Sequence, residues 1–306
     1  MGELALVPVT LPPNAIIVSI SQADSWLTCQ RKWMFSYLFE KQSDHLSRAL
    51  AIGVIGHDIL AVRYQALKDG MSDIDSQQEA WKKLSVYFSD GIYEPEILAV
   101  VHGLLSRYFE NDSLAGLEIL EVEEDFFVPI NDQFWFGMRI DLLLKDSRGR
   151  VRLIDHKFMY DFATPDALKQ NSQMPKYMAG LRFAGYPVVE AYLNMFRTRF
   201  KPHLISNKTD ADLFSRAPVG ITEERIKMNL EYQLRISERI VERRALPLEV
   251  AVEESLPVQN QMVCKNCPFR DPCMKMNEGM SATKALGTGY VPKTSGFEIT
   301  KNELVE

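Results

Sequence analysis

Four cysteines have a spacing that suggests metal chemistry. Cys264, Cys267 and Cys273 form a C-x2-C-x5-C run, and Cys29 stands near the opposite end of the 306-residue chain. Four thiolates are the number that a [4Fe–4S] cluster or a structural zinc takes. Either group would close a very long loop, which removes unfolded-state entropy worth about 5 kcal/mol. The spacing therefore predicts a structural metal site, with zinc and iron–sulfur both open.

Buried free thiols and a disulfide are the alternative roles for these cysteines. Residues 1–17 contain no basic stretch followed by a long apolar one, and prolines 8, 12 and 13 interrupt them, so we expect no signal peptide. No run of about 18 apolar residues occurs, so we expect no membrane span. These expectations favour a reduced, cytoplasmic compartment and hence metal ligation over a disulfide.

Composition describes an ordinary globular protein. Hydrophobic residues make up 46% of the chain and charged residues 25%, which suffices for one large or two modest domains. The net charge of −6 argues against a broadly basic surface that coats nucleic acid. A local basic groove remains compatible with that total.

Hydrophobic periodicity predicts helices on both sides of a block of strands. The first helix, 21–40, contains Cys29 and a buried aromatic side. Further helices are predicted at 54–69, 76–89, 95–110, 165–184 and 222–245, and strands at 117–129, 134–145, 150–157 and 188–196. The Gly-, Ser-, Thr- and Lys-rich residues 279–306 are expected to form a flexible tail.

Two predicted strands carry the second group of chemically informative residues. One ends in Gly137-Met138-Arg139-Ile140-Asp141, and the next contains Asp155-His156-Lys157. Strand alternation places Asp155 and Lys157 on one face, and a hairpin can bring Asp141 close to them. Two carboxylates beside a lysine are typical of phosphodiester hydrolysis assisted by Mg²⁺ or Mn²⁺. A surface salt bridge is the alternative for an isolated D-x-K.

Residues on two predicted helices could join this group. His57 follows Gly53-Val54-Ile55-Gly56 and is a candidate imidazole ligand for the same ion, although a structural histidine is the commoner role. Gln173 and Tyr177 stand four residues apart and so share one helix face, where they could meet the strands or a nucleic-acid backbone. Such a pair also occurs by chance in many helices.

The order of these features resembles the RecB-like branch of the PD-(D/E)XK nucleases. More narrowly, it is similar to the iron–sulfur members, the AddB nuclease domain and the CRISPR-associated RecB-like exonucleases. The resemblance covers about residues 19–278. Its motifs are Cys29 within Cys29-Gln30-Arg31-Lys32-Trp33, Gly53/Gly56-His57, Gly137-x3-Asp141, Asp155-x-Lys157, Gln173-x3-Tyr177 and Cys264-x2-Cys267-x5-Cys273.

This resemblance implies an α/β restriction-endonuclease-like core with a central mixed sheet, a helical N-terminal part and a C-terminal iron–sulfur staple. It implies that His57, Asp141 and Asp155 are metal ligands and that Lys157 is the catalytic lysine. Gln173 and Tyr177 would support the site and the DNA. The cluster ligands it implies are Cys29, Cys264, Cys267 and Cys273. The domain organisation expected is an extension at 1–18, a nuclease domain at 19–278 and the tail.

Two positions depart from or qualify that pattern. Gln30 follows Cys29 where the family often has proline, which leaves the thiolate in place. His156 fills the variable position, where its main-chain carbonyl rather than its ring is expected to face the metal. The chain has no GxxxxGK[ST] phosphate loop, so unwinding would need a partner such as a helicase or another recombination or replication protein.

The sequence thus predicts a metal-dependent deoxyribonuclease, an exonuclease on single-stranded or frayed DNA. The expected setting is DNA repair, recombination or the processing of phage and mobile-element DNA. One alternative is a non-catalytic DNA-binding or assembly subunit that keeps the stapled fold. Another is a zinc-bound protein of a different class.

Overall fold

The computed structural model describes residues 11–12, 15–44, 46–112, 114, 116–287 and 289–293. These residues form two compact units. The first unit takes Ser47–Phe126 and Arg139–Ile226, and the second takes the described parts of Pro8–Leu46, Phe127–Met138 and Lys227–Glu306. All candidate nuclease residues fall in the first unit, and all four cysteines fall in the second.

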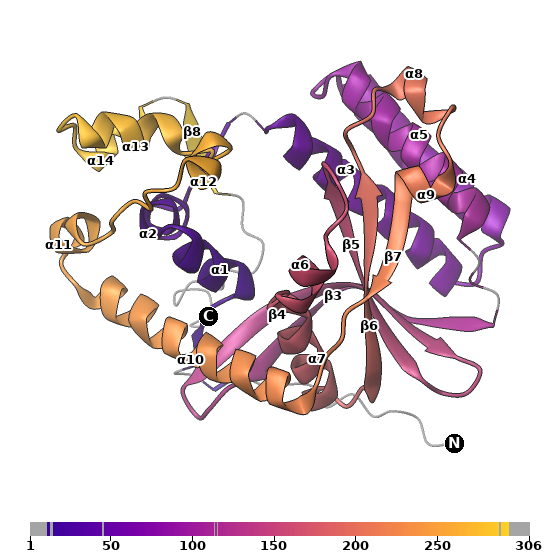
Figure 1. Cartoon of the computed structure of the whole chain (residues 1–306), viewed down its shortest axis with the longest axis horizontal. Coiled ribbons are helices and arrows are strands. Elements are labelled where there is room, and N and C mark those ends of the chain that lie inside the picture. Colours follow the sequence, from indigo (N-terminus) through magenta and orange to yellow (C-terminus); the bar gives the residue numbers. More distant parts are fainter. Residues whose placement is uncertain are drawn as a thin grey trace. The chain divides into compact units, whose positions relative to one another are not determined.

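A six-stranded mixed sheet runs through the described residues in the order β1-β4-β5-β6-β7, with β3 also paired to β4 (Figure 1). β4 pairs antiparallel with β5, β5 parallel with β6, and β6 antiparallel with β7. The strands are β1 (Ile16–Ile17), β3 (Leu117–Pro129), β4 (Phe134–Asp146), β5 (Val151–Met159), β6 (Val188–Arg197) and β7 (Phe214–Pro218). Helices α6 (Pro165–Lys169) and α7 (Gln173–Phe183) connect the parallel pair β5 and β6. This α/β fold with a mixed central sheet is the class that the sequence predicted.

The turn between β4 and β5 follows from its sequence. Gly149 has a φ of +79°, which glycine adopts without the steric cost of a Cβ. Asp146 caps the turn, because its Oδ1 accepts hydrogen bonds from the main-chain N–H groups of Arg148 and Arg150 at 2.9 and 3.0 Å. The tight hairpin fixes the register in which β4 and β5 present their side chains.

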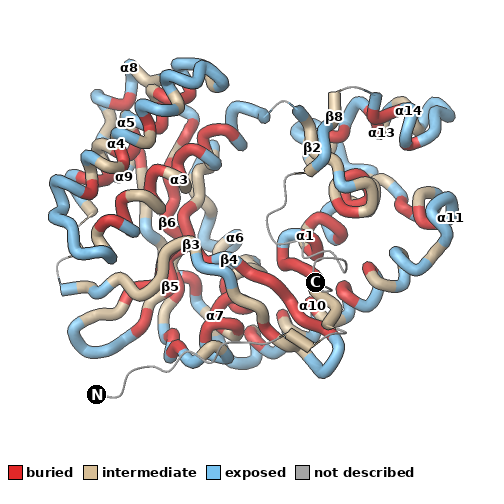
Figure 2. The backbone as a smooth tube through the Cα atoms, turned by 180° about the vertical axis from the view of Figure 1, so that it is seen from behind, coloured by how far each residue is buried: buried red, intermediate tan, exposed pale blue. Residues whose placement is uncertain are grey.

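Three long helices complete the core of the first unit: α3 (Arg48–Lys68), α4 (Asp73–Asp90) and α5 (Pro95–Asn111). Buried aliphatic side chains from these helices and from β4 and β5 form one hydrophobic cluster. Figure 2 colours the buried stretches of the backbone red. The short helices α8 (Pro202–Ile205) and α9 (Asp210–Leu213) pack on α5. Burial of this cluster holds α3 against β5 and so places the helix beside the strand that carries Asp155.

By length and composition alone, α3 could cross a membrane. Its residues Ile52, Ile55, Ile59 and Leu60 are almost completely buried in the protein core. That burial accounts for the high hydropathy of the helix.

The second unit contains the remaining helices and a two-stranded sheet. Its core joins aromatic side chains of the N-terminal segment, among them Trp26, Trp33 and Phe35, to apolar residues of the C-terminal helices, such as Ile240 and Phe269. Its elements are α1 (Ile20–Thr28), α2 (Gln30–Trp33), the π-helix η1 (Met34–Leu38), most of α10 (Glu223–Ala245), α11 (Leu248–Glu253), α12 (Gln261–Lys265), α13 (Arg270–Asn277), α14 (Ala282–Leu286), and strands β2 (Lys41–Ser43) and β8 (Tyr290–Pro292).

Three predicted elements need correction. The helix predicted at 21–40 is interrupted at Cys29, whose extended backbone (φ −168°, ψ 116°) separates α1 from α2. The helix predicted at 165–184 is two helices, α6 and α7, which residues 170–172 separate. Part of the predicted tail is structured, because α14 buries Ala282 and Leu286 in the second core and β8 pairs with β2. Residues 294–306 of that prediction lie outside the described residues.

Candidate active site

A close contact between α3 and β5 brings His57 to the sheet. A Cβ placed on Gly56 would lie 2.2 Å from the Phe158 ring, so glycine at this position allows the helix to approach the strand. The Phe158 ring stacks on Phe196 of β6, with ring centroids 4.6 Å apart. One residue after Gly56, His57 therefore projects toward the strands that carry the predicted carboxylates.

The antiparallel register of β4 and β5 brings Asp141 and Asp155 together. Leu142 pairs with Ile154. Asp141 directly precedes Leu142 and Asp155 directly follows Ile154, so the two aspartates stand opposite each other in this antiparallel register. Asp141 Oδ2 accepts a 2.6 Å hydrogen bond from the His156 main-chain N–H. Lys157 Nζ lies 2.7 Å from Asp155 Oδ2. The structure thus assembles His57, both carboxylates and the lysine of the predicted site from three elements.

Glu123 of β3 joins this group and was missed by the sequence analysis. His57 Nδ1 lies 3.7 Å from Glu123 Oε1 and 3.5 Å from Asp141 Oδ2. Among the described residues, these three side chains offer ligand atoms that all lie within 4.8 Å of one another. Glu123 also has a φ of +48°, which is uncommon for a residue other than glycine and often marks a functional site.

A sequence signal for Glu123 existed but was ambiguous. Acidic residues 121, 123, 124 and 125 crowd one strand, and strict alternation would have assigned them to faces in a fixed order. The left-handed backbone at Glu123 breaks that alternation, so the sequence could not identify which carboxylate faces His57.

Burial and mutual repulsion shift the protonation of the site. Burial, reinforced by the Asp141 charge and opposed by Lys157, raises the pKa of Asp155 to about 6. Burial also raises the pKa of Asp141, against the opposing charges of His57 and Lys157. For His57, desolvation works against the charged form, but the Asp141 and Glu123 carboxylates still raise its pKa. Carboxylates and an imidazole gathered at this cost form a donor set that fits a divalent cation.

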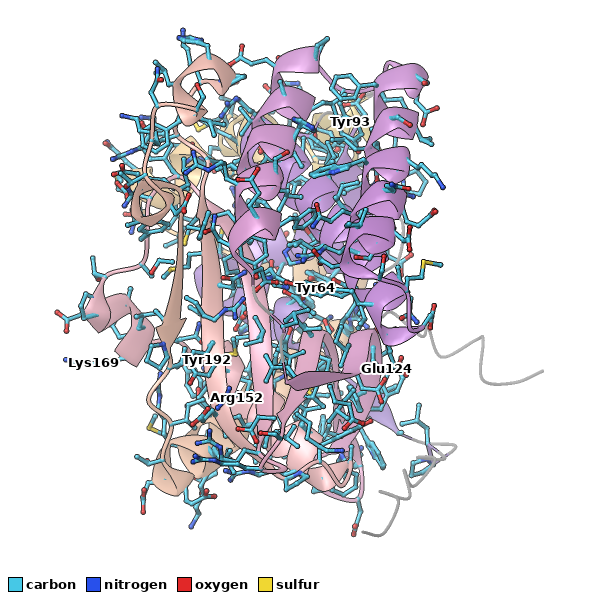
Figure 3. The ribbon with its side chains drawn as sticks, turned by 90° about the vertical axis from the view of Figure 1, so that its right-hand side faces the viewer. Tyr64, Tyr93, Glu124, Arg152, Lys169 and Tyr192 are labelled. Atoms are coloured by element: carbon cyan, nitrogen blue, oxygen red, sulfur yellow. The ribbon has the colours of Figure 1, made fainter. Side chains whose placement is uncertain are left out.

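The His156 ring points away from the carboxylates, onto the opposite face of β5. Its Nδ1 lies 3.0 Å from Asn194 Nδ2, and its ring stacks on Tyr64, with centroids 5.6 Å apart and planes 4° from parallel. Tyr64 lies between the helices and the sheet (Figure 3). Burial lowers the pKa of His156 far below its usual value, which keeps the ring neutral. The ring is therefore a support for β5, and the predicted contact of its carbonyl with a metal stays a prediction.

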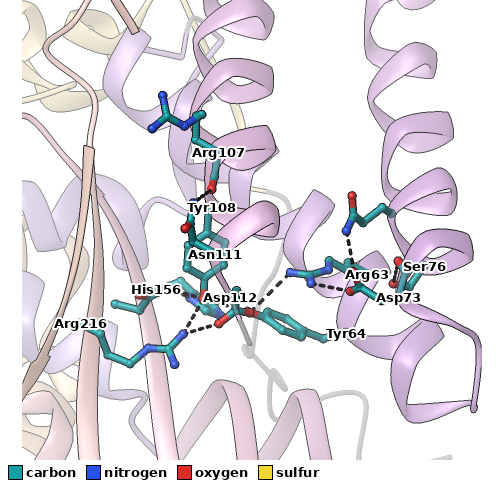
Figure 4. A network of polar contacts seen from close by, with 12 residues as sticks. Arg63, Tyr64, Asp73, Ser76, Arg107, Tyr108, Asn111, Asp112, His156 and Arg216 are labelled. Atoms are coloured by element: carbon teal, nitrogen blue, oxygen red, sulfur yellow. Dashed lines mark hydrogen bonds and ion pairs between the residues drawn. The ribbon is translucent and has the colours of Figure 1, made fainter. Parts of the chain in front are cut away.

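A buried polar network continues from His156 (Figure 4). Asn194 Nδ2 also donates to Tyr108 Oη at 3.0 Å, and Tyr64 donates to Asp112 Oδ2 at 2.8 Å. Arg216 reaches both Tyr108 Oη, at 2.6 Å, and Asp112 Oδ1, at 2.8 Å. The network ties α3, α5, β5, β6 and β7 together behind the candidate site. A rigid scaffold of this kind restricts the movement of catalytic side chains.

Gln173 and Tyr177 share one face of α7, as their spacing predicted. Gln173 Nε2 donates a 2.6 Å hydrogen bond to Tyr177 Oη, and the tyrosine is buried. Their predicted roles toward Lys157 and DNA stay predictions.

The four cysteines line one cavity of about 610 Å³ in the second unit. Cys29 Sγ accepts a hydrogen bond from the Val258 N–H at 3.5 Å, and Cys264 Sγ lies 3.7 Å from the Val258 carbonyl oxygen. Arg31 Nη1 lies 3.7 Å from Cys273 Sγ. The fold therefore brings Cys29 to the C-terminal cysteines across more than two hundred residues of sequence.

Comparison with known proteins identifies the superfamily of this chain. The model of the PD-(D/E)XK nuclease superfamily matches residues 17–274, and this chain belongs to that superfamily. A comparison with curated proteins gives no match. Among solved structures, the chain is similar to SSO0001, with 12% identity, 70% of this chain and 82% of that chain covered, and a TM-score of 0.33. Nothing about this chain can be inferred from a structure with so low a TM-score. Membership of the superfamily implies metal-dependent nuclease activity, and a nucleic-acid substrate, DNA, follows from it.

Proposed function

We propose that this chain is a metal-dependent deoxyribonuclease that acts as an exonuclease on single-stranded or frayed DNA. The observation that supports it most is the meeting of His57, Glu123 and Asp141 beside the Asp155–Lys157 pair. A surface salt bridge, the alternative for an isolated D-x-K, would not explain why Asp155 is only 1% exposed and why its pKa is raised.

Each residue has a role that follows from its position. His57, Glu123, Asp141 and Asp155 would hold Mg²⁺ or Mn²⁺, which supplies charge stabilisation at the phosphate and lowers the pKa of an attacking water. The His156 N–H donates to Oδ2 of Asp141 and so holds this carboxylate beside His57. Lys157 lies next to Asp155 and can stabilise the charge that develops on the phosphate or orient the water.

The test is incubation of the purified chain with end-labelled single-stranded, duplex and frayed DNA, with Mg²⁺, Mn²⁺ or a chelator. We expect release of short products from single-stranded and frayed ends, and no release with the chelator. Binding of DNA without any cleavage in either metal would favour the non-catalytic subunit instead.

We also propose a [4Fe–4S] cluster held by Cys29, Cys264, Cys267 and Cys273. All four thiols line one cavity. Four thiolates suit either a [4Fe–4S] cluster or a tetrahedral zinc, and the resemblance to the iron–sulfur members of the family favours the cluster.

The proposed cellular setting is a reduced, cytoplasmic compartment, with a role in DNA repair, recombination or phage and mobile-element processing. The sequence contains no GxxxxGK[ST] phosphate loop. Unwinding of duplex DNA would therefore come from a partner helicase. Co-purification of a helicase that raises the cleavage of duplex DNA would support this proposal.

A further inference from the structure

We propose that Leu50 and Val54 form an apolar ledge that receives an unstacked base next to the scissile phosphate, so that the site takes an unpaired DNA strand. This inference rests on the proposed nuclease function and names the structural feature that would select the substrate. The ledge is defined by these two side chains and by Gly53 between them.

The ledge is an exposed apolar face on a helix whose other side, with Ile52, Ile55 and Ile59, is buried in the core. Leu50 is 53% exposed and Val54 43% exposed, and their i, i+4 spacing puts them on one side of α3. Nothing lies within 4 Å of the position where a Cβ on Gly53 would stand, so there is open space above the backbone there. Covering exposed apolar surface of this kind with a ligand is favourable, because apolar area is removed from water.

The same face continues into the candidate active site. One cavity of about 810 Å³ is lined by Leu50, Gly53 and Val54 together with His57, Glu123 and Lys157. His57 follows Val54 by three residues, so the ledge and the imidazole lie on neighbouring turns of α3. A molecule bound in the cavity would meet an apolar surface beside the metal-ligating and cationic groups.

A nucleotide of an unpaired strand has the matching chemistry. Its phosphate is anionic and suits Lys157 and a bound cation, and its base has a flat, weakly polar face that packs on apolar side chains. Duplex binding depends on many cationic contacts to the phosphates of both strands. Apart from His57, the described residues lining this cavity include only two cations, Arg139 and Lys157, and Arg139 is in a bidentate pair with Asp125 at 2.5 and 2.7 Å. In a duplex the base would be stacked and unable to reach the ledge.

The test compares base-dependent binding by the wild type and by Leu50→Ser/Val54→Ser. Fluorescence anisotropy in a chelator, where no cleavage is expected, would measure the Kd for a short single strand, for matched strands with an abasic residue at either terminal nucleotide, and for a blunt duplex. Cleavage of the intact strand in Mn²⁺ would be followed in parallel. Ile74→Ser is the matched control, because Ile74 is 69% exposed in the same unit and does not line this cavity.

We expect the double variant to weaken binding of the intact strand roughly three- to tenfold, from lost apolar contact, with Ile74→Ser unchanged. One of the two abasic strands lacks the base that would contact Leu50 and Val54. The wild type and the double variant should bind that strand equally. Gly53→Leu should weaken binding of the intact strand in the same way, by filling the space above α3. Thermal melts that match the wild type would show that the variants are folded.

Two results would overturn the ledge: equal loss of affinity for intact and abasic strands in the double variant, or tighter binding of the blunt duplex than of the single strand by the wild type. Cleavage distinguishes this inference from the proposed function. Binding that depends on the base, without cleavage, would support the ledge and contradict the proposed nuclease. Cleavage together with binding that does not depend on Leu50 and Val54 would support the nuclease and contradict the ledge.

Discussion

The main-chain N–H of His156 donates a 2.6 Å hydrogen bond to Oδ2 of Asp141. One residue of β5 thus orients a carboxylate of β4, while its ring is fixed on the other face of the sheet by Asn194 and Tyr64. The residue between Asp155 and Lys157 therefore contacts Asp141 through its main chain and anchors β5 through its ring.

Replacing His156 by leucine should weaken this positioning. The ring contacts to Asn194 and Tyr64 are lost, so β5 should shift and Asp141 should lose part of its alignment. We expect the affinity for Mn²⁺, measured by calorimetry, to fall about tenfold, as for other residues that orient metal ligands. His156→Asn, which keeps a hydrogen-bonding group near Asn194, should recover part of that affinity. A purely structural role would lower the melting temperature in both variants and leave Mn²⁺ affinity unchanged.

Glu123 should behave as a ligand and not as one more surface acid. Glu123→Gln removes a charge within 3.7 Å of His57, so Mn²⁺ affinity should fall about tenfold and the pKa of His57, followed by NMR, should drop. The matched control is Glu124→Gln, because Glu124 is the exposed next residue. Equal effects of the two changes would remove Glu123 from the site.

Stability without metal should fall as the pH rises. The pKa of Asp155 is about 6 in the folded chain, against about 3.9 for an ordinary aspartate, so the folded state binds more protons between these values. The free energy of unfolding should therefore decrease from about pH 4 to pH 6. The raised pKa of Asp141 acts in the same direction over this range, and the raised pKa of His57 lowers stability further only above about pH 6.5.

Urea titrations in a chelator across this pH range would measure the slope. Asp155→Asn should flatten it, and added Mn²⁺ should raise stability at neutral pH because the ion neutralises the repulsion. An unchanged slope in Asp155→Asn would mean that other groups dominate.

If one cluster joins Cys29 to the C-terminal cysteines, substitutions of cysteines far apart in the sequence should lower stability equally. Anaerobically purified protein should be yellow-brown with about four irons per chain. Cys29→Ala and Cys267→Ala should each lose the cluster and lower the melting temperature to a similar extent, because either loss opens the same long loop. Met262→Ala, at an exposed residue two positions before Cys264, is the control. Colourless protein with one zinc, or full iron in Cys29→Ala, would contradict the staple.

Much of the fold was predictable because the signals were local. The strand alternation around Asp155 and the spacing of Gln173 and Tyr177 each depend on neighbouring residues, and the structure contains both features. Superfamily membership, which the motif order indicated, is confirmed.

Predictions from the sequence were wrong where tertiary contacts override local preference. The backbone at Cys29 is extended although its neighbours favour a helix, and only packing in the second unit shows it. Glu123 was missed because its left-handed backbone breaks the strand alternation. The residues of α14 lack a strong periodic pattern and fold because Ala282 and Leu286 meet a core assembled from distant segments.

The most direct test of the central claim is the cleavage rate of an Asp141→Asn/Asp155→Asn variant on end-labelled single-stranded DNA in Mn²⁺. Both changes keep side-chain size and remove the charges that would hold the cation. We predict that cleavage falls to background. DNA should be bound at least as tightly as by the wild type, because negative charge that faces the DNA backbone is lost. Cleavage at the wild-type rate would contradict the account and place the activity in another site or another protein.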